Sequence, residues 1–115
     1  MDDNVIVGKS KGFAIRVIKL YKHLCSSENE FVLSRQILRS GTSIGANVHE
    51  AIEGQSRKDF ISKMQIALKE ARETGYWLEL LHETDYISQP EYNSLNIDCT
   101  EIIKILVSII KTAKK

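Results

Sequence analysis

The residue types that most often perform chemistry in helical proteins are sparse in this sequence. His49 begins a His-Glu-Ala-Ile-Glu run, but a zinc-protease helix needs a second histidine where this chain has Glu53. Glu79 and His82 have the Glu-x-x-His spacing of di-iron bundles, and the sequence offers no second such pair. The residues therefore predict no metal site and no cofactor.

Nucleophilic side chains also lack the partners that would activate them. Cys25 and Cys99 have no CxxC spacing and no nearby histidine, which favours two reduced thiols over a zinc site or a disulfide. Ser40 and Ser43 have no base positioned beside them in the sequence. The glycines of the 41–45 segment are not followed by the Gly-Lys-Ser/Thr of a phosphate-binding loop. We predict that the protein is not an enzyme and has no small-molecule substrate.

The cations form a second candidate site, one that could contact phosphates. The chain has 16 Lys and Arg against 15 Asp and Glu, and this net charge of +1 excludes a polycationic coat protein. Eight cations fall near segment ends that a helical hairpin arrangement would bring together. They are Lys9, Lys11, Arg57, Lys58, Lys63, Lys111, Lys114 and Lys115. The competing interpretation is an ordinary solvated surface.

A polar stripe marks the middle of the chain. It begins at Arg39 and continues at helical steps through Ser43, Asn47 and Glu50. In an antiparallel hairpin that turns near residue 54, Arg39 lies level with the 70–73 segment. We predict an ion pair from Arg39 to Glu70 or Glu73. Its expected role is to fix helix register, and a binding site is the alternative.

Two glycines in the same stretch are four residues apart. Gly41 and Gly45 share one helical face, and glycine inside a helix costs about 1 kcal/mol relative to alanine. Small residues at this spacing are explained by the close approach of another helix. That helix could belong to the same chain or to a neighbouring subunit.

The elements that position these residues are helices. Apolar residues recur at three- and four-residue steps in four segments, and no segment has the alternation of a strand. We predict helices from about residue 10 to 25, from Ser34 to about 52, from Ser56 to about 83, and from Ser88 nearly to the C-terminus, each serine being an N-cap. Short connections between them predict an all-α, antiparallel up-down-up-down four-helix bundle that forms one domain over residues 1–115.

The bundle topology also predicts an axial charge asymmetry. No Lys or Arg occurs from Glu73 to Ile103, while that stretch holds seven carboxylates. With Glu28 and Glu30 in the first loop, we expect one acidic end and, opposite to it, one basic end. The N-terminus has no secretory signal, and no apolar stretch approaches the 20 residues that span a bilayer. We therefore expect a cytoplasmic protein without membrane contact.

The residues from Arg39 to Asn47, read as Arg-Ser-Gly-Thr-Ser-Ile-Gly-Ala-Asn, carry a resemblance to a known family. Together with Glu50-Ala51, the 58–61 run and the 67–74 run, they resemble the 23S ribosomal RNA intervening-sequence proteins. The resemblance extends over nearly the whole chain. It implies an antiparallel four-helix bundle that assembles into a homopentamer, and it does not imply an enzyme.

The same resemblance suggests a partner. The accessory proteins of diversity-generating retroelements look like relatives of this family, and they bind nucleic acid and a reverse transcriptase. We therefore expect a non-enzymatic homo-oligomeric scaffold or adaptor that binds RNA or DNA through its basic end. The alternative is a protein–protein assembly module with no nucleic-acid ligand.

Overall fold

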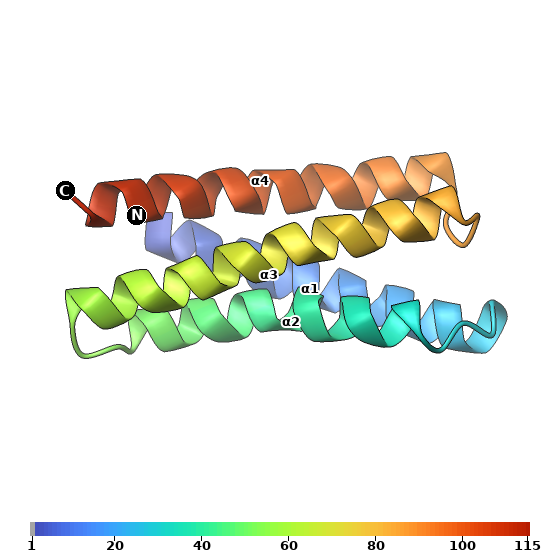
Figure 1. Ribbon diagram of the computed structural model, residues 1–115, viewed down its shortest axis with the longest axis horizontal. Coiled ribbons are helices and arrows are strands. Elements are labelled where there is room, and N and C mark those ends of the chain that lie inside the picture. The colour runs from blue at the N-terminus through green and yellow to red at the C-terminus, as the bar shows by residue number, and fades with distance from the viewer. Residues whose placement is uncertain (1) are drawn as a thin grey trace.

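Four antiparallel helices make up the protein. The computed structural model describes the backbone of residues 2–115 and the side chains of residues 5–115. The helices are α1 (Asp2–Ser27), α2 (Leu33–Ile52), α3 (Arg57–Glu83) and α4 (Gln89–Ala113), and residues 2–115 contain no strand. Each helix packs against the next along the chain, and α4 packs against α1 to close the ring (Figure 1). The predicted up-down-up-down bundle is confirmed.

The core is a stack of apolar layers, to which every helix contributes one stripe at three- and four-residue steps. The largest fully buried side chains include Phe13, Ile37, Met64, Leu78 and Ile102. They lie in one continuous cluster that runs along the bundle axis, which is 45 Å long. None of the helices in residues 2–115 is long and apolar enough to cross a membrane.

The first helix begins earlier than predicted, at Asp2 rather than near Ser10. Ile6 and Ser10 are fully buried and continue the stripe of Phe13 and Val17 toward the N-terminus. Two glycines in this stretch weaken the helical signal of the sequence. Tertiary packing of the buried face overrides that weak propensity.

The start of α2 shows a second error of the sequence-based interpretation. Ser34 is not the N-cap, because the helix begins one residue earlier and the Ser34 side chain is fully buried. The Glu30 carboxylate takes the capping role. Its Oε1 accepts from the Ser34 amide at 2.7 Å, and its Oε2 accepts from the amides of Leu33 at 3.0 Å and Val32 at 3.3 Å. Glu30 therefore points into the bundle rather than adding charge to its surface.

The other helix boundaries are as predicted. The Ser56 hydroxyl accepts from the Asp59 amide at 3.1 Å at the start of α3. Ser88 and Glu91 form a reciprocal capping box at the start of α4, where Pro90 lies in the first turn. At the ends of α1 and α3, Asn29 and Asp85 take the left-handed conformation that usually favours glycine.

Gly41 and Gly45 lie against α1 of the same chain, which answers the question left open by the sequence. A Cβ atom added at Gly41 would lie 2.8 Å from both γ-methyl groups of Val17. One added at Gly45 would meet the Ser10 Oγ at 3.4 Å and the Ser10 backbone at 3.6 Å. The two glycines therefore set the distance between α1 and α2.

A surface groove follows the seam between α1 and α4. Its floor includes Leu20 and Leu95 toward one end and Phe13 and Ile102 toward the middle. Ion pairs cross it, because Lys9 contacts Glu101 at 3.0 Å and Arg16 contacts Asp98 at 2.6 Å.

Candidate functional site

One end of the bundle gathers exposed cations. The α2–α3 turn, the start of α1 and the end of α4 meet there (Figure 1). Five exposed cations at this end have no ion-pair partner within residues 5–115, and we call them the basic end. They are Arg57, Lys58, Lys111, Lys114 and Lys115. Lys11, also exposed, lies farther along α1.

Two of the eight predicted phosphate-contacting cations are engaged elsewhere. Lys9 binds Glu101, and the Lys63 Nζ lies 2.9 Å from a carboxylate oxygen of Glu50. Glu53 and Asp59 are exposed beside the basic end and reduce its charge. Among the described residues, the five cations of the basic end still outnumber these two carboxylates.

The surface beside Arg57 and Lys58 suits an anion. These two side chains border a shallow hollow that is also lined by Ile61, Ser62 and Gln65. The hollow lies on the first two turns of α3, where unpaired backbone amides and the helix dipole favour negative charge. The carboxylate of Asp59, in the first turn of α3, already interacts favourably with this positive end of the helix dipole.

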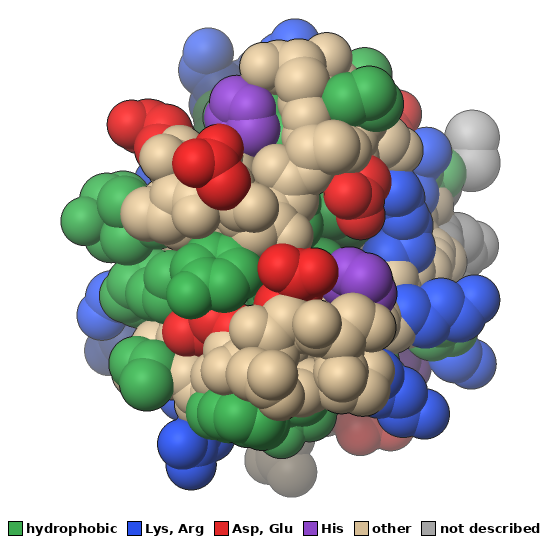
Figure 2. Space-filling view, turned by 90° about the vertical axis from the view of Figure 1, so that its right-hand side faces the viewer, with side chains coloured by type: hydrophobic (Ala, Val, Ile, Leu, Met, Phe, Trp, Pro, Cys, Tyr) green, Lys and Arg blue, Asp and Glu red, His purple; other side chains and the backbone are tan. Residues whose placement is uncertain are grey.

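The opposite end exposes four of the seven carboxylates that the sequence predicts there, and none of them has an ion-pair partner within residues 5–115: Glu79, Glu83, Asp85 and Glu91. The other three carboxylates of the stretch from Glu73 to Ile103 lie farther along the helices, and each is paired with a cation: Asp98 with Arg16, Glu101 with Lys9, and Glu73 with Arg39. Figure 2, which views this end, shows separated carboxylates among apolar and neutral atoms, with Lys and Arg side chains around the edge. The sequence-based count of charge along α3 and α4 left out the helices that pack beside them, so it missed these three ion pairs; the acidic end itself stays a prediction.

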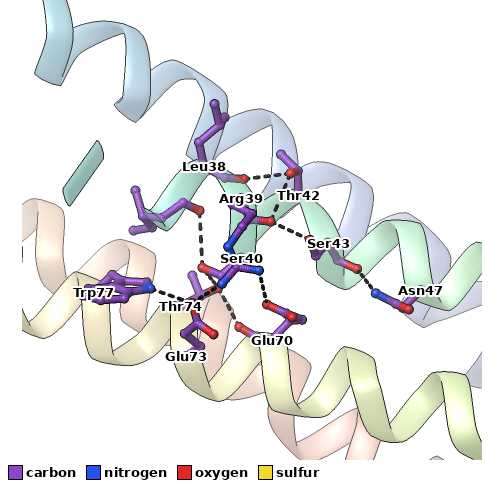
Figure 3. Close-up of polar contacts among 11 residues, drawn as sticks. Leu38, Arg39, Ser40, Thr42, Ser43, Asn47, Glu70, Glu73, Thr74 and Trp77 are labelled. Atoms are coloured by element: carbon purple, nitrogen blue, oxygen red, sulfur yellow. Dashed lines mark hydrogen bonds and ion pairs between the residues drawn. The ribbon is translucent and has the colours of Figure 1, made fainter. Parts of the chain in front are cut away.

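The polar stripe of α2 becomes an ion-pair cluster with α3 (Figure 3). The Arg39 guanidinium donates to Glu70 at 3.4 Å and, at shorter distance, to Glu73, as predicted. The Trp77 Nε1 also donates to Glu73, at 3.0 Å. That indole hydrogen bond, and then Arg39, lower the pKa of the Glu73 carboxyl, while the hydrogen bond to Glu73 raises the pKa of Arg39.

The side chains of Ser43 and Asn47, which continue the stripe, make no hydrogen bond to α3. The Ser43 hydroxyl donates to the Arg39 carbonyl at 2.6 Å, and the Asn47 amide donates to the Ser43 carbonyl at 2.8 Å. Both bonds stay within α2, so these side chains satisfy their own helix backbone. Only Arg39 and the Glu50–Lys63 pair connect the two helices along this line.

A buried hydroxyl pair between the same helices was missed from the sequence. The Thr74 Oγ1 lies 2.9 Å from the Ser40 Oγ, and both side chains are fully buried. Thr74 interrupts an otherwise apolar stripe, and this was the available signal. Together with the Arg39 cluster, the pair gives α2 and α3 one preferred register.

We expect Arg39→Gln to lower the free energy of unfolding by about 1 kcal/mol at pH 7, because two partly buried carboxylates lose their cation. Glu73 has a lowered pKa in the folded protein, so its contribution is present above its unfolded-state pKa and is lost as pH falls through the folded pKa. The deficit of the variant should therefore shrink on acidification. Urea unfolding followed by Trp77 fluorescence at pH 7 and pH 3 measures both quantities. Lys104→Gln is the control, and an equal deficit at both pH values would contradict the assignment.

The remaining candidate groups lie apart from one another. Within the described residues, no three His, Cys, Asp or Glu side chains are placed to hold a metal ion. The Cys99 thiol donates to the Ala71 carbonyl at 3.3 Å, and burial, followed by the nearby Asp98, raises its pKa to about 11. Both cysteines are free thiols. His82 stacks on Tyr92 with ring centroids 4.6 Å apart, which gives this histidine a packing role.

Comparison with known proteins identifies the family. Residues 2–108, which include all of α2 and α3, match the 23S rRNA-intervening sequence protein family. The chain belongs to this family. The resemblance of the Arg39–Asn47 run is therefore confirmed over nearly the full length.

A solved relative supports the same assignment. This family member is 61% identical to a protein of unknown function from the S23 ribosomal protein family of Bacteroides thetaiotaomicron. The crystal structure of that protein superposes with a TM-score of 0.95, over 96% of this chain and 99% of the other. A search of curated proteins gives no significant match. Family membership thus establishes the fold and leaves the activity to be argued from the surface.

Proposed function

We propose that this protein is a non-enzymatic, homo-oligomeric scaffold that binds RNA or DNA through the basic end of each subunit. The observation that carries the proposal is the gathering of Arg57, Lys58, Lys111, Lys114 and Lys115 at one end without ion-pair partners in residues 5–115. These cations come from the start of α3 and from the end of α4 with the two residues that follow it, two segments that are far apart in the sequence. The fold brings them to one end of the bundle.

Assembly would convert this modest charge into a binding surface. Each Lys or Arg that contacts a phosphate releases counterions, so affinity rises with the number of contacts made together. A single subunit offers few such contacts. In a ring of parallel subunits, such as the pentamer that the family resemblance implies, the same set repeats around one rim. The phosphate backbone of a nucleic acid is long enough to contact several subunits.

We expect Lys58→Gln/Lys114→Gln to weaken binding of structured RNA and duplex DNA at least tenfold at low salt. The slope of log affinity against log salt should fall by about 1 for each phosphate contact removed. Fluorescence anisotropy of labelled RNA and DNA at low and moderate salt gives both values. The matched control is Lys69→Gln/Lys104→Gln, which removes the same charge from exposed mid-helix positions.

Two outcomes would contradict the proposal. If the wild-type oligomer binds neither RNA nor DNA at low salt, the protein–protein assembly module becomes the better function. If the control variant weakens binding as much as the basic-end variant, only net charge matters and the basic end is not the site.

A further inference from the structure

The end of the bundle opposite the basic end has apolar side chains that residues 5–115 leave exposed. Phe31 and Val32, in the connection before α2, are 50% and 67% exposed. Carboxylates of α3, α4 and their connection lie at the same end, without ion-pair partners within the described side chains (Figure 2). Adjacent exposed apolar side chains favour a surface that another macromolecule covers. We call the following set the carboxylate end: Phe31, Val32, Glu79, Glu83, Asp85 and Glu91.

The charge at this end differs from helix to helix. The stretch from Glu73 to Ile103 contains no Lys or Arg, so the α3–α4 connection carries only negative charge. The other two helices carry exposed cations there, Lys22 near the end of α1 and Arg35 near the start of α2. The Arg35 Nε donates to the Phe31 carbonyl at 2.7 Å, which places this cation beside the exposed apolar pair. A partner that fits this surface must offer cations to α3 and α4, and a carboxylate with apolar atoms to α2.

The basic end of the same chain has this distribution of groups. Arg57 and Lys58 lie at the start of α3, and Lys114 directly follows α4. At the end of α2, Ile52 is 43% exposed. The next residue, Glu53, is an exposed carboxylate without an ion-pair partner within residues 5–115. Helix by helix, the basic end therefore offers the charge that the carboxylate end lacks.

A second copy can present these groups in register. When two bundles lie head to tail along one axis, the four helices keep the same order around that axis (Figure 1). One rotation about the axis then places each helix against the same helix of the next copy. At α3 this brings Arg57 to Glu83, and at α2 it brings Glu53 to Arg35, beside the exposed apolar residues of both ends. At α4 it brings the C-terminal lysines to Glu91.

We propose that the bundles stack head to tail, with the basic end of one copy on the carboxylate end of the next. The occupant is a second copy because its charges match those of the carboxylate end at three helices. Two basic ends, or two carboxylate ends, would place like charges together. One bundle is only 21 by 19 Å across, so a single stacking contact is small and weak. In the parallel ring of the proposed function the contact repeats in every subunit, which multiplies its strength.

Stacking has a consequence for nucleic-acid binding, and this part of the inference rests on the proposed function. The cations that contact the next copy are the ones that would contact phosphates. A second copy and a nucleic acid therefore compete for the basic end. Added RNA should dissociate the stacks, and the apparent affinity for RNA should fall as the protein concentration rises.

Two charge-reversal variants test the contact. Glu79→Lys/Glu83→Lys makes the carboxylate end positive, and Arg57→Glu/Lys58→Glu places negative charge on the basic end. Each new charge suits the helix terminus at which it lies, so circular dichroism should show folded bundles. In sedimentation at low salt, each variant alone should need a roughly tenfold higher concentration than the wild type to stack. An equimolar mixture of the two should restore the wild-type value, because unlike charges face each other again at both ends.

Electron microscopy of the wild type at low salt gives the geometry of the stacks. We expect columns with an axial repeat close to 45 Å, the length of one bundle. Moderate salt or structured RNA should shorten these columns. The control is Lys69→Glu/Lys104→Glu, which makes the same charge change as Arg57→Glu/Lys58→Glu but at exposed positions away from both ends. It should stack like the wild type.

A further variant tests the apolar part of the contact without a change of charge. Val32 is the N-cap residue of α2, and its side chain makes no capping hydrogen bond. Val32→Ser introduces a residue that favours this position, so the fold should be kept. Its columns should nevertheless be shorter than those of the wild type at the same protein concentration.

The outcomes separate the stacking contact from the proposed function. If the wild type at low salt forms no species larger than a single ring or a single bundle, stacking is wrong, and binding of RNA or DNA is judged separately by anisotropy. If both reversal variants stack alone, or if their mixture aggregates without the 45 Å repeat, the two ends are not partners. An equal loss for the Lys69→Glu/Lys104→Glu control would likewise overturn the assignment. If columns form as expected and the wild type binds neither RNA nor DNA, the proposed function fails and the stacking contact stands.

Discussion

A Gly45→Leu variant should lose about 3 kcal/mol of unfolding free energy, measured by urea denaturation at pH 7. A Cβ at this position already lies 3.6 Å from the Ser10 backbone, so the atoms beyond it would overlap α1 itself. Backbone atoms in a packed helix cannot rotate away as a flexible side chain can. The variant must therefore separate α1 from α2 or distort one of them.

Gly45→Ala is the matched control for this prediction. Its single added carbon fits at 3.4 Å from the Ser10 Oγ, which is ordinary van der Waals contact. Alanine also favours helix by about 1 kcal/mol over glycine, so this variant should be no less stable than the wild type. A leucine variant that unfolds at the wild-type urea concentration would show that α1 and α2 are not in close contact here.

The second large effect is expected at Glu30, where Glu30→Gln should cost about 2 kcal/mol at neutral pH. The carboxylate accepts three backbone amides at the start of α2. In glutamine one of the two accepting oxygens becomes an NH₂ group, which would face amide donors. The variant also removes the negative charge at the positive end of the helix dipole.

The pH dependence of this effect has a definite sign. Burial alone would raise the pKa of Glu30, but the backbone hydrogen bonds from Leu33, Ser34 and Val32 outweigh it and lower the pKa below its ordinary value of 4.5. The stabilisation is therefore complete above the unfolded-state pKa and is lost as pH falls through the folded pKa. Glu30→Gln should be most destabilising at neutral pH and least so in acid.

Thermal unfolding at several pH values between 3 and 7 measures this profile. Glu28→Gln is the control, since Glu28 is an exposed carboxylate of the same loop, 4.0 Å from His23. Equal losses for the two variants at pH 7 would show that Glu30 does not cap α2.

The sequence was sufficient for features that depend on local pattern. The Ser56 and Ser88 caps, the Arg39 ion pair and the apolar stripe of α3 follow from residue types at fixed helical steps, and the structure contains them. Such features need only helix geometry and hairpin topology.

Features that depend on non-neighbouring helices could not be predicted in the same way. Ser34 has the chemistry of an N-cap, but Glu30 replaces it because the loop turns that carboxylate inward. Asp98 and Glu101 of α4 are paired with Arg16 and Lys9, which reach α4 from the other end of the sequence. For the candidate site, the cations themselves were predictable. Which of them are engaged, as Lys63 is by Glu50, required the structure.

The order in which the helices pack has a kinetic consequence. Within one subunit, three of the four helix–helix contacts join consecutive helices through short turns. Such local contacts form quickly because little loop entropy is lost. The fourth contact, between α1 and α4, joins the two extremes of the chain. A surface groove follows this contact, and the ion pairs that Lys9 and Arg16 make across it are partly exposed to solvent. We therefore expect this seam to close last during folding and to open first in the native state, with amide exchange along its edge faster than in the α2–α3 hairpin.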